Sequence, residues 1–242
     1  LNVGLVHNAV VSYIIDRSYR EGVIVRSVNP VVCECNDGGI NCIQKRAIGE
    51  KEVLEAITSA SADFAQGAVG AGRGTVCYGL KGGIGSSSRI MVIDGITYTL
   101  GVLVQSNYGS SRDLRIAEIP ADTQETDQGS IILIVATDLP LSSRQLKRVI
   151  KRTSVGMARL GSYIGHGSGE VMIGFTTSRP VQISPHVYSC SVLEEALLNN
   201  AFRAAGEAAE EAILQSMLYA DEDQTLDGKK VGSLRQLLNQ KG

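Results

Sequence analysis

The chain has 242 residues, 43% of them hydrophobic, which suits one large domain or two small ones with a real core. The formal net charge is −2, so we expect no basic surface for nucleic acid or for an anionic membrane. The longest apolar runs have the length of strands and are too short to span a bilayer. The five cysteines lack zinc-ligand spacing, which favours free thiols in a reducing, cytoplasmic compartment and no bound metal.

The first third of the chain mixes helical and extended patterns. Residues 1–15 are largely apolar and fit either a helix or a buried strand. Residues 23–35 have the pattern of a strand, and Asn36-Asp37-Gly38-Gly39 directly after them is a strong turn signal. Residues 50–66 carry apolar side chains at helical spacing, so a helix is predicted there.

Residues 67–88 are rich in glycine, and two explanations compete for them. A phosphate-binding loop would need a GxxxxGK[ST] motif, or a GxGxxG that opens a helix after a strand, and neither occurs. Glycines that allow tight turns and close backbone contacts are therefore the better interpretation. Residues 90–105 predict a hairpin that turns at Asp94-Gly95, with Asn107 just past the returning strand.

Residues 109–128 are polar and predict an exposed, flexible segment in which chain cleavage is easily accommodated. The apolar run from Ile131 to Ala136 is typical of a strand buried on both faces. Ser130 stands at the mouth of this strand, directly after Gly129. A Gly-Ser turn is the ordinary explanation. Cleavage before Ser130, however, would give one residue both a hydroxyl and a free α-amine, a nucleophile beside a base.

The remainder of the chain predicts two long helices and a polar tail. Ser142 or Ser143 can cap a helix that runs to about Leu160. Residues 191–220 predict a strong amphipathic helix rich in Ala, Glu and Leu, and residues 221–242 predict a tail with one short helical piece.

Between these helices, residues 165–170 predict a loop that leads into a strand over 171–176. Ser168 and Glu170 lie two residues apart, so along an extended segment both side chains can face one site. His166 is flanked by glycines and is more often an incidental turn residue than a general base. The alternation of strands with long helices argues for layered α and β structure.

Six short motifs follow one another along the chain: Glu34 with Asp37-Gly38; Asn41; Lys81-Gly82-Gly83-Ile84-Gly85; Gly101-Val102-Leu103-Val104-Gln105 with Asn107; Gly129-Ser130 with Ala136-Thr137-Asp138; and Gly167-Ser168-Gly169-Glu170. In this order they resemble the DmpA-type aminopeptidases, the group of L-aminopeptidase/D-alanyl-esterases and β-peptidyl aminopeptidases. The resemblance covers essentially the whole chain. Each motif alone would be a weak signal, and their common order makes the resemblance specific.

The resemblance implies an α/β fold, a four-layer αββα sandwich in which two sheets are covered by helices. It implies a single domain over residues 1–242, made as a precursor that cuts itself between Gly129 and Ser130 into 1–129 and 130–242. It further implies a homo-oligomer, by resemblance a tetramer, that acts on small peptides or amino-acid amides. No nucleic acid, membrane or cofactor is implied.

The resemblance also assigns roles residue by residue. Ser130 matches the nucleophile that the cut exposes. Ser168 and Glu170 match the second serine and the acidic residue, and Asn107 matches the asparagine that stabilises the oxyanion. Glu34 matches the glutamate that holds the free ammonium of the substrate, which would restrict the enzyme to substrates with a free N-terminus.

Asn36 stands where the family often has a tyrosine that serves as a further oxyanion or acid contact, so the resemblance makes Asn36 a substrate-binding candidate whose amide can still donate a hydrogen bond. Cys42 replaces an aspartate common after Asn41. One alternative is an unprocessed, non-catalytic relative that acts as a binding protein. Another is an N-terminal-nucleophile acyltransferase, against which Ser130 argues because those enzymes usually use threonine. Choice among L-amino-acid amides, D-alanyl esters and β-peptides depends on pocket shape, which a sequence does not give.

We predict that the purified protein consists of two fragments, 1–129 and 130–242, that stay associated. The reason is that the Gly129–Ser130 bond follows a polar segment and precedes a core strand, so both fragments share one core. Intact-mass spectrometry under denaturing conditions, compared with native gel filtration, checks this. A catalytically active preparation with a single uncut mass would contradict it.

Overall fold

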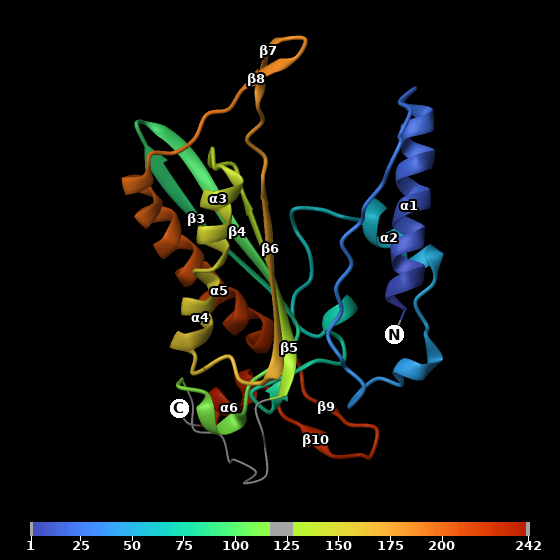
Figure 1. Ribbon diagram of the computed structural model, residues 1–242. Coiled ribbons are helices and arrows are strands. Elements are labelled where there is room, and N and C mark those ends of the chain that lie inside the picture. Colours follow the sequence, from blue (N-terminus) through green and yellow to red (C-terminus); the bar gives the residue numbers. More distant parts are fainter. Residues whose placement is uncertain (1, 117–127, 241–242) are drawn as a thin grey trace. The chain divides into compact units, whose positions relative to one another are not determined.

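The computed structural model describes residues 2–116 and 128–240 (Figure 1). Its internal contacts divide the chain into two compact units. The first comprises Leu1–Glu34 and Asn41–Ala65, and the second comprises Cys35–Ile40 and Gln66–Gly242. Each unit is described by itself. The single domain expected over 1–242 stays a prediction.

The first unit is built from two helices, α1 (Val3–Arg20) and α2 (Glu50–Thr58), with a short 3-10 helix at Ile43–Lys45. Arg46 donates hydrogen bonds to the Asn2 side chain, which links the start of α1 to the segment before α2. Of the two conformations predicted for residues 1–15, the structure has the helix, which begins at Val3.

Two predictions for this part of the chain are wrong. Residues 23–35 form no strand, because a strand needs backbone hydrogen bonds from a neighbour and no described segment pairs with them. The helix predicted over 50–66 ends at Thr58. The side-chain hydroxyls of Thr58 and Ser59 both donate hydrogen bonds to the Glu55 carbonyl. Such local bonds compete with the backbone hydrogen bonds that would continue the helix.

The second unit is organised around a four-stranded sheet with the strand order β3-β4-β5-β6. The first two pairs are antiparallel, and β5 pairs with β6 in parallel. Strand β5 is therefore central, as its apolar sequence predicts. The strands are β3 (Ile84–Ile93), β4 (Ile96–Asn107), β5 (Gln128–Thr137) and β6 (Gly167–Thr176).

The predicted hairpin is confirmed, and its turn explains its register. Asp94 has φ 50° and Gly95 has φ 78°, the left-handed pair that a two-residue hairpin turn requires. Ile93 consequently pairs with Ile96, and the register continues to Ile84 opposite Gln105. The strands run further than predicted, so that Asn107 is the last residue of β4 and not the residue beyond it.

The helices of this unit are α3 (Ser143–Ile150), α4 (Thr153–Arg159), α5 (Leu198–Leu218) and α6 (Leu234–Asn239). Figure 1 shows α3, α4 and α5 gathered on one side of the sheet. Ser142 caps α3 in a capping box with Gln145, which confirms one of the two predicted caps. The helix predicted from there to Leu160 is interrupted between α3 and α4, and α5 begins at Leu198 instead of 191.

The core lies between the sheet and the alanine-rich face of α5. Small side chains on that face let the helix approach the strands closely, and Gly85 on β3 marks the closest approach. A Cβ on Gly85 would lie 2.0 Å from the carbonyl oxygen of Ala212, which no real pair of atoms tolerates. The α5 residues of this core are Leu198, Ala201, Ala204, Ala205, Ala208, Ala209, Ala212, Ile213 and Met217.

The remaining strands form three two-stranded sheets, β1 with β2, β7 with β8 and β9 with β10. The glycine-rich segment 67–88 holds the first of these, and its glycines serve close approach and positive φ, as the sequence predicts. The bounds are β1 (Val76–Cys77), β2 (Leu80–Lys81), β7 (Val181–Ser184), β8 (Val187–Ser189), β9 (Asp223–Gln224) and β10 (Lys230–Val231).

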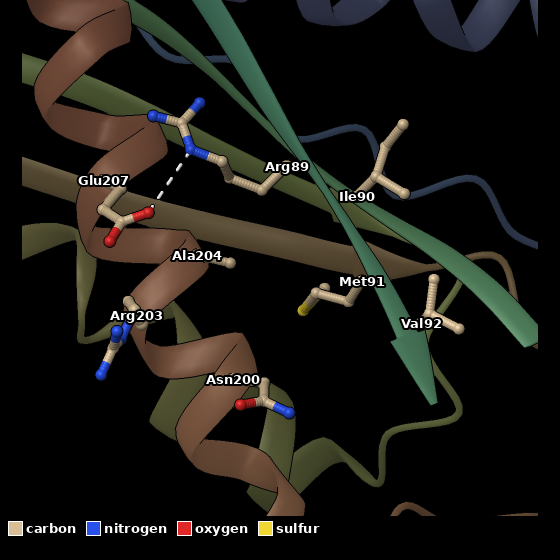
Figure 2. Close-up of a pocket in the computed structure, with 8 residues that line it drawn as sticks. All are labelled: Arg89, Ile90, Met91, Val92, Asn200, Arg203, Ala204 and Glu207. Atoms are coloured by element: carbon tan, nitrogen blue, oxygen red, sulfur yellow. Dashed lines mark ion pairs between the residues drawn. The ribbon is translucent and has the colours of Figure 1, made fainter. Parts of the chain in front are cut away.

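The face of the sheet opposite α5 carries exposed apolar side chains. Figure 2 shows this alternation on β3, where Arg89 and Met91 face a hollow of about 250 Å³ beside α5 while Ile90 and Val92 point to the other side. Arg89 is paired there with Glu207 at 3.6 Å. The exposed apolar residues of this face include Ile90, Val92 and Phe175.

Two further sequence predictions concern the polar stretch 109–128 and the absence of a membrane-spanning segment. Of the polar stretch 109–128, residues 117–127 lie outside the described residues, whereas Ser110, Ser111 and Leu114 are buried. Within residues 2–116 and 128–240, no helix combines the length and hydropathy that crossing a membrane requires.

We predict that Gly85→Ala lowers the free energy of unfolding by at least about 1–3 kcal/mol, the usual range for overpacking a core. The added Cβ meets the backbone of α5, which cannot move without displacing the whole helix. Gly101→Ala is the matched control, because on neighbouring β4 a Cβ has no heavy atom closer than 3.9 Å. Urea unfolding of both variants checks this, and equal midpoints would contradict it.

Candidate functional site

The pairing of three strands places Asn107, Ser130 and Gly169 side by side. Asn107 on β4 is the register partner of Ser130 on β5, and Ser130 is the register partner of Gly169 on β6. Paired residues point to the same face of a sheet, so the side chains of Asn107 and Ser130 share one face. A Cβ on Gly169 would lie 3.8 Å from that of Ser130. Glycine thus leaves room beside the serine.

Ser168 and Glu170 flank this row from the opposite face. They lie inside β6 and not in the loop that the sequence predicts, because β6 begins at Gly167. Their register partners are Gly129 and Ile131, and Ile131 belongs to the core beneath α5. The two side chains therefore share a face, as predicted, but not the face of the Ser130 side chain. The backbone nitrogen of Ser130 lies between the two faces.

The oxygens of this pair are buried without partners. Ser168 Oγ and Glu170 Oε1 are inaccessible to solvent and have no hydrogen bond to any described residue. Folded proteins satisfy nearly all buried polar groups, and an unsatisfied one costs about 1–3 kcal/mol. Two such atoms, two residues apart, are typical of a place where a further polar group must arrive during function.

Gly129 is the one residue type that fits before Ser130. Its φ is +125°, a conformation that side chains avoid, and a Cβ there would lie 2.1 Å from the carbonyl oxygen of Asn107. The backbone on the N-terminal side of Ser130 is therefore pressed against the end of β4. Glycine adopts this conformation without steric cost, whereas a residue with a side chain would be strained there by on the order of 1–3 kcal/mol.

The Asn107 side chain is fixed at both ends. Its Oδ1 accepts a hydrogen bond from the Val76 backbone N–H at 3.0 Å, and its Nδ2 donates to the Asn36 carbonyl at 3.0 Å. The Asn36 side chain is occupied elsewhere, since its Oδ1 accepts from Gly38 N–H at 3.0 Å in the predicted turn. Asn36 therefore meets Asn107 through its backbone, and its exposed side chain shapes the turn.

Three buried groups lie beside this row, Cys35, Cys77 and Tyr108. The Cys35 thiol lies 3.6 Å from the Ser130 carbonyl oxygen, to which it can donate, and 3.8 Å from that of Gln105. Burial raises the pKa of Cys77 to about 12, so this thiol stays protonated at neutral pH. Burial, with smaller contributions from neighbours that include the Glu170 carboxylate, also raises the pKa of Tyr108. Both groups are thus neutral walls and not acids or bases.

Glu34 belongs to the first unit and is exposed, whereas the residues described above belong to the second. Its predicted contact with a substrate ammonium stays a prediction. His166 is exposed in the turn just before β6. In the described ranges, no three His, Cys, Asp or Glu side chains gather as metal ligands would.

Sequence reasoning missed the contacts that hold the site. Cys35 was expected only as a buried free thiol, yet it contacts the Ser130 carbonyl. The Val76 N–H donates to Asn107 Oδ1, and the Lys81 ammonium donates to the Thr75 carbonyl of the same peptide group; a backbone N–H leaves no mark in a sequence. A signal did exist for Lys81, a single charged residue enclosed by Leu80 and glycines.

Known proteins are similar to this chain over nearly its whole length. The sequence profile of peptidase family S58 matches residues 1–231. The chain is 37% identical over 245 residues to the beta-peptidyl aminopeptidase BapA of Sphingosinicella microcystinivorans, covering 91% of this chain. The chain spans 61% of the length of that relative.

Solved structures give the same result. A Pyrococcus horikoshii protein superposes with a TM-score of 0.86 at 40% identity, covering 98% of this chain and 69% of that one. The L-aminopeptidase D-Ala-esterase/amidase of Ochrobactrum anthropi superposes with a TM-score of 0.83 at 32% identity, covering 100% and 71%. That enzyme is described as a prototype of the serine aminopeptidases and a variant of the Ntn hydrolase fold.

We predict that Gly129→Ala slows the appearance of the 130–242 fragment by about tenfold or more, because an increase of about 1.4 kcal/mol in the activation free energy lowers a rate tenfold. The Cβ would displace either the Asn107 carbonyl or the bond before Ser130. Gly22→Ala is the matched control, because Gly22 also has a positive φ of 70° but has open space around it. Timed mass spectra of freshly expressed protein check this. Normal processing of Gly129→Ala would contradict it.

Proposed function

The chain belongs to peptidase family S58, and from this premise we propose that it is a self-processing serine aminopeptidase or amidase with Ser130 as its nucleophile. The proposed reaction removes the N-terminal residue from short peptides, amino-acid amides or esters through an acyl-enzyme. The observation that carries the proposal is the unpartnered buried pair, Ser168 Oγ and Glu170 Oε1, whose residues are in register with Gly129 and Ile131 on either side of Ser130.

Cleavage of the Gly129–Ser130 bond would supply the group that this pair lacks. The backbone nitrogen of Ser130 becomes an α-amine, whose ordinary pKa of about 7.7–8.0 leaves part of it neutral near pH 7. This nitrogen lies between the Ser130 hydroxyl on one face and Ser168 with Glu170 on the other. The amine takes the proton from Oγ, and either keeps it or passes one on to Ser168 and Glu170 on its other side, while Oγ attacks the acyl carbon.

Asn107 is the donor best placed to stabilise the oxyanion that this attack creates. Its amide shares the face of the Ser130 side chain, and Nδ2 carries a second proton besides the one given to Asn36. An oxyanion donor of this kind is typically worth about 3–4 kcal/mol of transition-state stabilisation. The tetrahedral intermediate then collapses: the scissile C–N or C–O bond breaks, and the α-ammonium of Ser130 protonates the leaving amine or alcohol and is neutral again. Water attacks the acyl-enzyme with this amine as general base, and the acyl–Oγ bond breaks to release the acid and restore the Ser130 hydroxyl.

The substrate class follows from the family. A free N-terminal ammonium would pair with Glu34, whose carboxylate gives a charge-assisted and directional contact. The matched relatives act on β-peptides or on L-amino acid and D-alanyl derivatives, as their names state. We propose a small amide or ester of one of these classes, hydrolysed in the cytoplasm by a homo-oligomer.

The exposed face of the sheet supports the proposal that a further layer of structure covers it. The structure matches the Ntn-hydrolase variant of the Ochrobactrum enzyme, and its described sheet is covered by helices on the α5 side. On the other side, Ile90 is 71% and Phe175 53% exposed. Exposed apolar surface of this kind favours burial against a partner layer. We therefore propose the four-layer αββα sandwich, with a second sheet on this face.

We predict that Ser168→Ala and Glu170→Gln each lower kcat by about 10²-fold or more, the usual contribution of general acid–base groups. The double variant should be little worse than either single one, because residues that act as a unit are not additive. The measurement is hydrolysis of alanine and β-alanine 4-nitroanilides by preparations shown by mass to be cut before Ser130. Ser130→Ala is the inactive reference.

Two outcomes would contradict the proposal. Processed Ser168→Ala and Glu170→Gln with near-normal kcat would remove this pair from the reaction and leave the α-amine as the base. Equal turnover of free and N-acetylated alanine 4-nitroanilide would remove the requirement for a free N-terminus, and with it the aminopeptidase.

A further inference from the structure

Lys81 is a buried cation held by carbonyl groups. Its side chain has no exposed surface, which is rare for lysine. Its ammonium lies 3.2 Å from the Gly72 carbonyl oxygen, 2.9 Å from that of Thr75 and 3.0 Å from that of Gly82. An ammonium has three protons and no acceptor, so these three carbonyls use all of them. Neutral lysine would leave one bond unmade.

One of these carbonyls belongs to the peptide group that orients Asn107. The Thr75 C=O and the Val76 N–H are parts of one planar peptide. Its oxygen accepts from Lys81, and its nitrogen donates to Asn107 Oδ1 at 3.0 Å. The Thr75 oxygen also accepts from Gly82 N–H at 3.0 Å, which fixes the peptide further. Lys81 is thus two hydrogen bonds from the Asn107 amide.

These linked hydrogen bonds allow the charge of Lys81 to act on the Asn107 amide. A cation bound to a carbonyl oxygen polarises the peptide and strengthens its N–H as a donor, as hydrogen-bond chains do in a low dielectric. A stronger bond to Oδ1 keeps the Asn107 amide from flipping, so that Nδ2 keeps one proton on the Asn36 carbonyl and the other proton available. The Lys81 backbone is itself held, because its N–H donates to the Gly232 carbonyl at 2.8 Å.

We propose that Lys81 is a positioning residue for catalysis, whose ammonium holds the Thr75–Val76 peptide that orients the Asn107 amide toward the oxyanion. The inference rests on the proposed function, because it needs Asn107 as the oxyanion donor. It adds a residue that touches neither the substrate nor the Ser130 side chain.

Mildly alkaline pH can remove the proton that gives Lys81 its charge. Burial lowers the pKa of Lys81 to about 8, with Arg73 acting in the same direction and Asp223 and Asp37 opposing it. Proton loss above that pH breaks one of the three carbonyl bonds. The unfolded chain keeps the ordinary value of 10.5, so between about 8 and 10.5 the folded state binds fewer protons and this group makes stability rise with pH. Loss of activity in that range is therefore not unfolding caused by Lys81.

The test compares Lys81→Met with Asn107→Ala in protein cut before Ser130, with alanine 4-nitroanilide as the probe. Lys81→Met should lower kcat on the order of 10²-fold, as loss of an oxyanion donor does, and leave KM unchanged. The double variant should be little worse than Asn107→Ala alone. Lys147→Met, on the exposed surface of α3, is the matched control and should behave as wild type.

A pH profile makes the test independent of whether Lys81→Met folds. The kcat of the wild-type protein should fall above pH 8 at saturating probe, and this alkaline limb should be absent from Asn107→Ala. Folded Lys81→Met with normal kcat, or an alkaline limb retained in Asn107→Ala, would overturn the inference while leaving the proposed function intact. A wild-type protein that neither cuts itself nor hydrolyses the probe would overturn both.

Discussion

The central position of β5 is the constraint on which the candidate site depends. Because β5 pairs with β4 on one side and β6 on the other, Ser130 cannot shift without breaking backbone bonds on both edges. The same pairing sets Asn107 beside Ser130 and sets Ser168 and Glu170 on the reverse face. A parallel partner at β6 is what brings the starts of both strands to one edge of the sheet, so a serine and a carboxylate forty residues apart in sequence become neighbours in space.

Around this row, backbone crowding restricts one position to glycine. Glycine is required at Gly129 because the Asn107 carbonyl occupies the space of a side chain, whereas Gly169 across the sheet has ordinary room. The bond before Ser130 is thus held in a conformation that few residues adopt, next to two unsatisfied buried oxygens. The proposed cleavage of that bond would supply an amine to these two oxygens, which have no hydrogen-bond partner among the described residues.

The sequence predicted local features well where local chemistry decides them. Asp94-Gly95 and the Ser142 cap are examples, since turn and cap geometry depend on a few neighbouring residues. It failed for residues 23–35, because a strand depends on a partner that an extended pattern cannot guarantee. For the site, the resemblance supplied Ser130, Asn107, Ser168 and Glu170, and the register now shows how the sheet arranges them. The hydrogen bond from the Val76 N–H to Asn107 could not be predicted, because a backbone donor leaves no mark in a sequence.

The choice of carbonyls and not a carboxylate as partners for Lys81 has a physical consequence. A buried ion pair would cancel the charge and leave no field beyond itself, and its desolvation cost is often not repaid. Three neutral carbonyls satisfy the protons but keep the positive charge, whose field passes along the Thr75–Val76 dipole toward Asn107. A developing oxyanion at Ser130 is the charge that such an arrangement favours. The low dielectric that strengthens this field is also what lowers the pKa of Lys81, so the same burial that makes the cation useful sets the pH above which it is lost.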